Sequence, residues 1–151
     1  MATPPKVELI KEFIEEVYSY IPSLISGLDV LRQSPGQIEV LEETHRLVHT
    51  IKGASSMVGL DGLSHIAAQM EDYLDEILAG NQQLTDASLN TMQETIKLVQ
   101  EYCGGDLNGG VAARSMLKEA VSAFRHIRGL SLAEDEPTYQ DLLASVPEHE
   151  G

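Results

Sequence analysis

Apolar residues recur at steps of three and four along most of this chain, which is the period of an α-helix and not of a β-strand. The first such run covers residues 6–33. Pro22 lies within it and predicts a kink or a break near Tyr20 and Ile21, because proline cannot donate the hydrogen bond that continues a helix. A chain patterned in this way is restricted to folds that pack helix on helix.

Turn signals divide the rest of the pattern into further helices. Ser34 is placed to act as an N-cap, with Pro35 at the first helical position and Gln37 closing a capping box. The helix that begins there should end near Gly59.

Two more helices follow with short connections. Asp61 can cap a third helix, which Gly80 ends, and Thr85 or Asp86 begins a fourth, which Gly104 and Gly105 close. Short connections make successive helices neighbours. We therefore predict an all-α fold, an up-down antiparallel four-helix bundle formed by residues 1–103.

The remainder of the chain divides into two parts. Residues 104–130 form a glycine-rich link and a fifth helix from Val111 to Arg128, whose apolar stripe either packs on the bundle or pairs with another molecule. Residues 131–151 contain no lysine or arginine but six acidic residues. We interpret them as an acidic, largely disordered tail or linker, with one helical turn around Tyr139 to Ala144.

Charge and composition narrow the classes of partner. The 151 residues carry a formal net charge of -14, which disfavours binding to nucleic acid or anionic membrane and favours protein partners. A single cysteine, Cys103, excludes an internal disulfide, and its place on an apolar stripe predicts that it is buried. Neither a signal peptide nor a long uncharged apolar segment is present, so we expect a cytoplasmic protein.

The most informative stretch is HRLVHTIKGASSMVG, residues 45–59. On a helix with about 100° per residue, His49 lies roughly 150° from the middle of the apolar stripe. It should therefore face solvent, with Lys52 and Ser56 further along the same exposed side. Met57, like Met70 and Met92, is expected to fill the core.

This arrangement suits nucleophilic chemistry at phosphorus. A neutral imidazole can attack without first losing a proton, and Lys52 supplies a positive charge one turn away. Gly53 costs roughly 1 kcal/mol in a helix interior relative to alanine, and close approach of another protein would account for it. On the next helix Glu71 lies at the border of the apolar stripe, where its carboxylate can accept a hydrogen bond from Nδ1 of His49.

The segment from His49 to Leu60, with Lys52, Gly53 and Gly59, followed by Met70 and Glu71, resembles the histidine phosphotransfer (Hpt) family. It is most similar to the N-terminal phosphotransfer domain of CheA-type and hybrid chemotaxis kinases, over residues 6–103. The resemblance implies a phosphocarrier of two-component signalling that is not by itself an enzyme. His49 would receive a phosphoryl group from a histidine kinase ATP-binding domain and pass it to an aspartate of a response-regulator receiver domain.

The same resemblance implies no cofactor or metal bound by this chain, since ATP and magnesium belong to the partner domains. Gly53, Ser56 and His45 would lie on the partner surface. One position departs from the family. The histidine that commonly precedes the carboxylate by one turn is replaced by Ala68, and His65 lies about 120° around the helix from Glu71, which makes it a poor substitute.

Two other functions remain as alternatives. The first is a helical docking module that binds a partner through the same surface without being phosphorylated. The second is a metal site, because His45 and His49 have the spacing of two ligands on one helix, with Glu42 a turn earlier. The sequence is not H-E-x-x-H and shows no evident third ligand, which weakens the metal interpretation.

Overall fold

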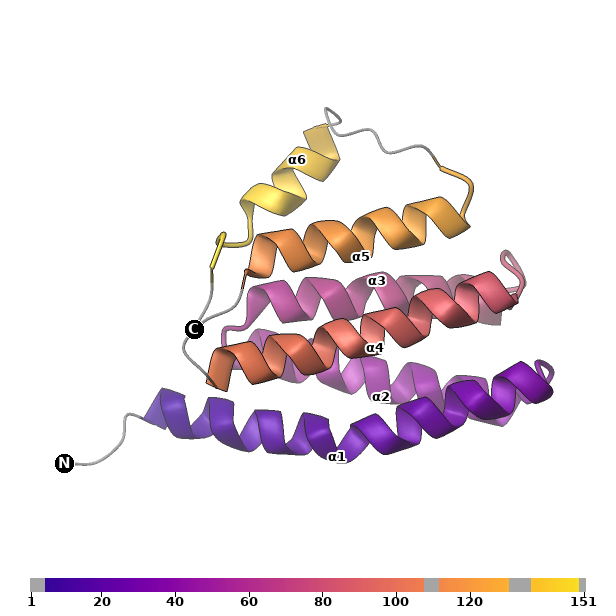
Figure 1. Cartoon of the computed structure of the whole chain (residues 1–151), viewed down its shortest axis with the longest axis horizontal. Helices are drawn as coiled ribbons and strands as arrows, with labels where there is room; N and C mark the ends of the chain where they lie inside the picture. Colours follow the sequence, from indigo (N-terminus) through magenta and orange to yellow (C-terminus); the bar gives the residue numbers. More distant parts are fainter. Residues whose placement is uncertain (1–4, 108–111, 131–136, 150–151) are drawn as a thin grey trace.

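The computed structural model describes residues 5–107, 112–130 and 137–149 (Figure 1). All regular structure in these ranges is helical. The helices are α1 (Pro5–Gln33), α2 (Ile38–Met57), α3 (Asp61–Leu78), α4 (Asp86–Leu107), α5 (Ala113–Ile127) and α6 (Pro137–Ala144). None of them, within the part of the chain that is described, is both long and apolar enough to cross a membrane.

The first four helices form the predicted up-down bundle. Each packs on its neighbours in the chain, and α4 returns to α1 to close the ring (Figure 1). Their apolar faces meet in one continuous core, whose largest fully buried side chains include Ile14, Leu24, Ile51, Leu63 and Met92. Burial of this kind contributes about 25 cal/mol per Å² of apolar surface and is what holds the helices together.

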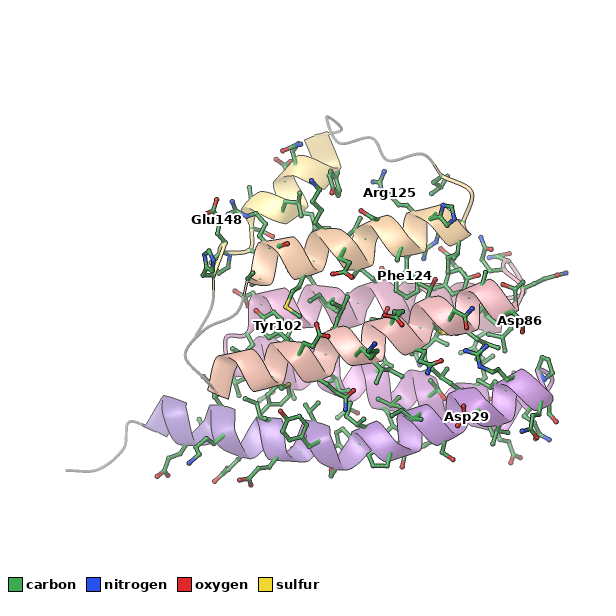
Figure 2. The ribbon with its side chains drawn as sticks, in the orientation of Figure 1. Asp29, Asp86, Tyr102, Phe124, Arg125 and Glu148 are labelled. Carbon is green, nitrogen blue, oxygen red and sulfur yellow. The ribbon has the colours of Figure 1, made fainter. Side chains whose placement is uncertain are left out.

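The fifth helix packs on its own bundle. It lies against α3 and α4, with Leu117, Val121 and Phe124 buried in the shared core. Figure 2 shows Phe124 on the side of α5 that faces α4. Its ring lies 5.8 Å from that of Tyr73 on α3. Of the two alternatives for this stripe, the structure shows the intramolecular one.

The prediction of a disordered tail is wrong for residues 137–149. α6 has two turns instead of one, and Tyr139 and Val146 are buried among the core residues. Arg125 of α5 stacks over the Tyr139 ring, on the side of α5 that faces α6 (Figure 2). Arg114 donates to the Val146 carbonyl at 2.8 Å. A few apolar residues are enough to hold α6 in place, because α5 already forms a surface on which they can pack. Residues 131–136 and 150–151 lie outside the described ranges.

Several predicted helix boundaries need correction. Residues 34–37 form a turn, in which the Gln37 N–H bonds to the Ser34 carbonyl at 3.1 Å, so α2 begins at Ile38 without a side-chain cap. Asp61 is the first residue of α3 and does not cap it. α4 does not end at Gly104 and Gly105 but continues through them to Leu107. Neither glycine has the positive φ that would end the helix.

Other boundaries are confirmed. Thr85 and Ser88 exchange side-chain to backbone hydrogen bonds at the start of α4, which is a reciprocal cap. Gly59 and Gly80 have φ near +83° and +81° and end α2 and α3. In α1 the proline causes no break. The helix continues through Pro22 and bends near its middle (Figure 1).

Candidate functional site

His49 projects from the middle of α2 into solvent, as its position on the helix predicted. Its side chain is 64% exposed, whereas Val48 and Ile51 on either side of it are buried. The burial of those neighbours fixes the rotation of α2 about its axis. The direction of the His49 side chain is therefore set by the packing of α2 against the core and not by a loop.

The nearest partner of the ring comes from α3, which runs antiparallel to α2. Glu71 Oε2 contacts His49 Nδ1, and Glu71 Oε1 contacts the Lys52 ammonium. The Glu71 side chain is only 7% exposed, so this carboxylate is held below the surface with both oxygens occupied. A carboxylate is an acceptor, and therefore Nδ1 carries the proton and donates. Nε2 is left as the nitrogen with a free electron pair.

The protonation state of Glu71 follows from competing effects. Burial raises the pKa of Glu71, but the hydrogen bonds that it accepts from Lys52 and His49, together with the positive charge of Lys52, lower the pKa by a larger amount, so that it lies below the usual value for glutamate. The same hydrogen bond raises the pKa of Lys52. Glu71 is thus an anion and Lys52 a cation throughout the physiological range.

We predicted that Lys52 supplies a positive charge one turn from His49. Its ammonium is bound to Glu71, the same carboxylate that holds the ring, and nothing in the sequence indicated this ion pair. The backbone carbonyl of Lys52 accepts hydrogen bonds from the hydroxyl groups of Ser55, at 2.9 Å, and Ser64, at 3.0 Å. The Ser64 contact ties α3 to α2 one turn beyond the histidine. The charge of Lys52 remains close to His49, since both contact one carboxylate.

A second histidine and carboxylate pair lies one turn earlier along the same seam. His45 Nε2 is 2.6 Å from Asp75 Oδ1, and the His45 ring is parallel to the His49 ring within 6°, with centroids 6.4 Å apart. Moving four residues forward on α2 corresponds to moving four residues back on α3. His45 is three-quarters buried by this arrangement and faces α3, which limits the area that it offers to a partner.

Beyond Lys52 the side chains on α2 are small as far as Ser56, so this surface of the helix stands close to the backbone. Apart from its own helix backbone and chain neighbours, a Cβ built on Gly53 would meet no heavy atom of the described residues within 4 Å, so the packing there does not require glycine at this position. Ser56 is exposed. Met57, which we expected in the core, is 88% exposed, because it is the last residue of α2 and lies about 80° from His49 around the helix, on the side that faces solvent. Met70 and Met92 are buried as predicted, and so is Cys103.

Three carboxylates gather on α3 beside the site. Oxygens of Glu71, Asp72 and Asp75 lie within 4.8 Å of one another. Loss of water around Asp72 and the adjacent Glu71 charge raise the pKa of Asp72. Two of these groups already have cationic or histidine partners, Glu71 in Lys52 and His49, and Asp75 in His45. Glu42, the third residue of the metal alternative, is exposed on α2.

These features, an exposed imidazole held from below by a buried carboxylate on a helical bundle, are those of a phosphotransfer domain. Residues 8–102 match the family described as the Hpt domain, and the chain belongs to that family. It is a phosphotransfer module of two-component or chemotaxis-type signalling. Hpt domains generally work with histidine kinases and response regulators.

Curated relatives agree with this assignment. The chain is 28% identical over 131 residues to the sensor histidine kinase CheAY of Helicobacter pylori, a match that covers 83% of this chain and 16% of that protein. It is 32% identical over 89 residues to the chemotaxis protein CheA of Halobacterium salinarum, covering 59% and 13%. With CheA of Bacillus subtilis it shares 26% over 141 residues, covering 91% and 21%. The matched region is therefore a small part of each of these relatives.

Proposed function

We propose that His49 is the phosphoacceptor of this module. It receives a phosphoryl group from the ATP-binding domain of a histidine kinase and passes it to an aspartate of a receiver domain. The observation that carries the proposal is the placement of Glu71, which holds Nδ1 from a buried position and leaves Nε2 on the exposed side of a ring that is 64% accessible.

The transfer balances without a separate base. The Nε2 electron pair attacks phosphorus, the bond from phosphorus to its leaving oxygen breaks, and that oxygen keeps the electron pair. The proton on Nδ1 stays in place, so the phosphorylated ring is positively charged and the Glu71 carboxylate balances it. When an aspartate oxygen later attacks phosphorus, the bond from phosphorus to Nε2 breaks and its electrons return to the ring. His49 is then neutral, as at the start.

Lys52 has an electrostatic role in this scheme. Its ammonium is anchored by Glu71, so it stays beside His49 while the charge of the ring changes during the reaction. A phosphoryl group bound to Nε2 brings negative oxygens into this field, and a preorganised cation stabilises them without having to move. The Lys52 and Glu71 pair together has no net charge, which avoids repelling an anionic donor.

The chain acts as a carrier in this proposal and not as an enzyme. ATP and magnesium are held by partner domains, and the chain is part of, or a substrate for, a CheA-type kinase. The similarity to three CheA-type proteins supports this choice of pathway.

The experiment compares the native chain with His49→Gln. Each is incubated with a chemotaxis-type kinase catalytic domain and radiolabelled ATP, and then with a receiver domain and magnesium. We expect label that is lost in acid, resists base and moves to the receiver with the native chain, and no label on His49→Gln. His49 is exposed, so this variant should keep the native circular dichroism spectrum.

Two results would count against the proposal. Acid-labile label retained by His49→Gln would place the phosphoryl group on another residue. A native chain that binds the receiver but takes no label, from the kinase or from phosphoramidate, would favour the docking module instead. Phosphoramidate is included because it needs no protein contact with the donor.

A further inference from the structure

We infer that Met57, with Gly53 and Ser56, forms a docking surface for the receiver domain, and that this surface determines how well a receiver engages phosphorylated His49. The inference rests on the proposed function of His49. It adds Met57, which we expected in the core because methionine is apolar, and it distinguishes between the two partners that react at the same histidine.

Met57 is the most exposed of the large apolar side chains in the described residues, at 88%. A single exposed leucine or methionine would need no explanation. This one lies near the proposed reaction centre. Eight residues beyond His49, it is about 12 Å along the helix and about 80° around it. Gly53 lies between them, about 40° from His49, and Ser56 lies about 20° from His49 on the other side.

The surface of α2 between His49 and Met57 has small, uncharged residues from Gly53 onward. Residues 53–60 contain no acidic or basic residue, in a chain where 34 of 151 residues are Asp, Glu, Lys or Arg. Lys52 turns toward Glu71 on α3, whereas Gly53 and Met57 lie on the other side of His49 around the helix. An acidic protein thus presents one neutral strip, with a large apolar side chain at its end.

The low surface points to the receiver more than to the kinase. An aspartate has one methylene between its backbone and its carboxylate, so its oxygen reaches phosphorus only when the receiver backbone comes very close to α2. The reacting atoms must approach to about 3–3.5 Å. The phosphoryl group of ATP is at the far end of a triphosphate, so its distance from the kinase backbone is not set by so short a side chain. Close contact across Gly53 is therefore demanded by the receiver, and Met57 lies where that contact would continue.

Methionine suits this position chemically. Its unbranched thioether side chain adapts to an apolar partner surface, and a residue of this kind can anchor contacts to different receivers. The occupant that we assign is a receiver domain presenting an uncharged apolar patch beside its phosphoaccepting aspartate. Burial of Met57 against that patch should affect binding more than the chemical step, because the side chain is too far from phosphorus to touch it.

The test uses Met57→Ser, Met57→Leu and the control Leu130→Ser in the full chain. Leu130 is 56% exposed and follows α5, which packs on α3 and α4 and not on α2. Each variant is phosphorylated on His49 and mixed with a receiver already shown to accept the group from the native chain. We expect Met57→Ser to lower kcat/KM for transfer to the receiver about tenfold through KM, with Met57→Leu and Leu130→Ser near native.

The outcomes separate this inference from the proposed function. If the native chain takes no label on His49, the phosphoacceptor proposal fails and this inference fails with it. If the native chain is labelled and Met57→Ser transfers to the receiver at the native rate, only the docking surface is refuted. Equal slowing of uptake from the kinase and of transfer to the receiver would overturn the assignment to the receiver, and loss of kcat with unchanged KM would overturn the docking role.

Discussion

Replacing Gly53 with alanine should stabilise the protein and impair its activity at the same time. Gly53 lies in the interior of α2, and a Cβ built there meets no heavy atom of the described residues within 4 Å beyond its own helix backbone and chain neighbours. The substitution therefore adds no clash and removes the conformational penalty of glycine, a gain of about 0.5–1 kcal/mol. For a domain of this size that gain corresponds to a rise in Tm of roughly 1–4 °C.

The same methyl group should hinder transfer. It stands one turn from His49 on the surface that a receiver must cross, and holding the reacting groups even about 1 Å out of place can cost as much as 100-fold. We expect a smaller loss, about tenfold, because a partner can tilt to accommodate one methyl group. Thermal unfolding by circular dichroism gives the first quantity, and the rate of transfer from phosphorylated His49 to a receiver gives the second.

Gly104→Ala is the matched control. Gly104 is also helical, and its Cβ would meet only the Tyr18 hydroxyl, at 3.7 Å, on the α1 and α4 side of the bundle. It should leave transfer unchanged. A Gly53→Ala protein that is less stable than native would refute our account of the free space. One that is more stable and transfers at the native rate would refute the idea that glycine is there for a partner.

Three further predictions follow from the described contacts. Glu71→Gln should slow phosphoryl uptake from the kinase about tenfold. A neutral amide accepts a hydrogen bond from Nδ1 but does not balance the charged ring, and a charge-assisted hydrogen bond is stronger than a neutral one by about 1.4 kcal/mol. Uptake at the native rate would remove Glu71 from the mechanism. Because the pKa of Glu71 is lower in the folded protein than in the unfolded chain, where it is near 4.5, the ionised carboxylate stabilises the fold at pH values above 4.5. This stabilisation is lost as the pH falls through the pKa of the folded state. In acid unfolding, the free energy of unfolding of Glu71→Gln should therefore depend less steeply on pH below about 5 than that of the native chain. Tyr139→Phe should be neutral or stabilising by up to about 1–3 kcal/mol in urea unfolding, since the buried Tyr139 hydroxyl has no hydrogen-bond partner among the described residues. A clear loss of stability would show that this hydroxyl is satisfied in solution.

The parts of the site that could be predicted are those determined by helix geometry. The exposure of His49 follows from its angle to the apolar stripe, and that stripe is buried as expected. The contact with Glu71 was within reach for the same reason, because a residue at the border of a stripe meets the adjacent helix. The depth of Glu71 could not be deduced, since it depends on how closely α2 and α3 approach.

What the sequence left undetermined depends mainly on contacts between distant segments. Met57 was expected in the core because methionine is apolar, but its angle on α2 places it on the solvent side of the helix, where it is exposed. The acidic composition of residues 131–151 predicted disorder, yet α6 packs on a surface made by α5. The pairing of Lys52 with Glu71 likewise results from the register of two helices, and the spacing of residues on α2 contains no information about α3.

The separation of His49 and Glu71 on different helices has a consequence during synthesis of the chain. A ribosome-bound chain that has exposed α2 but not α3 carries a histidine with no carboxylate to fix its tautomer, in a helix whose apolar face is still uncovered. Only when residues 61–78 fold back does Nδ1 acquire its partner, which leaves Nε2 as the nitrogen with the free electron pair. On the proposed function, phosphoryl uptake at the native rate therefore requires the α2 and α3 hairpin, and a chain in which α3 has not yet folded onto α2 should be phosphorylated more slowly.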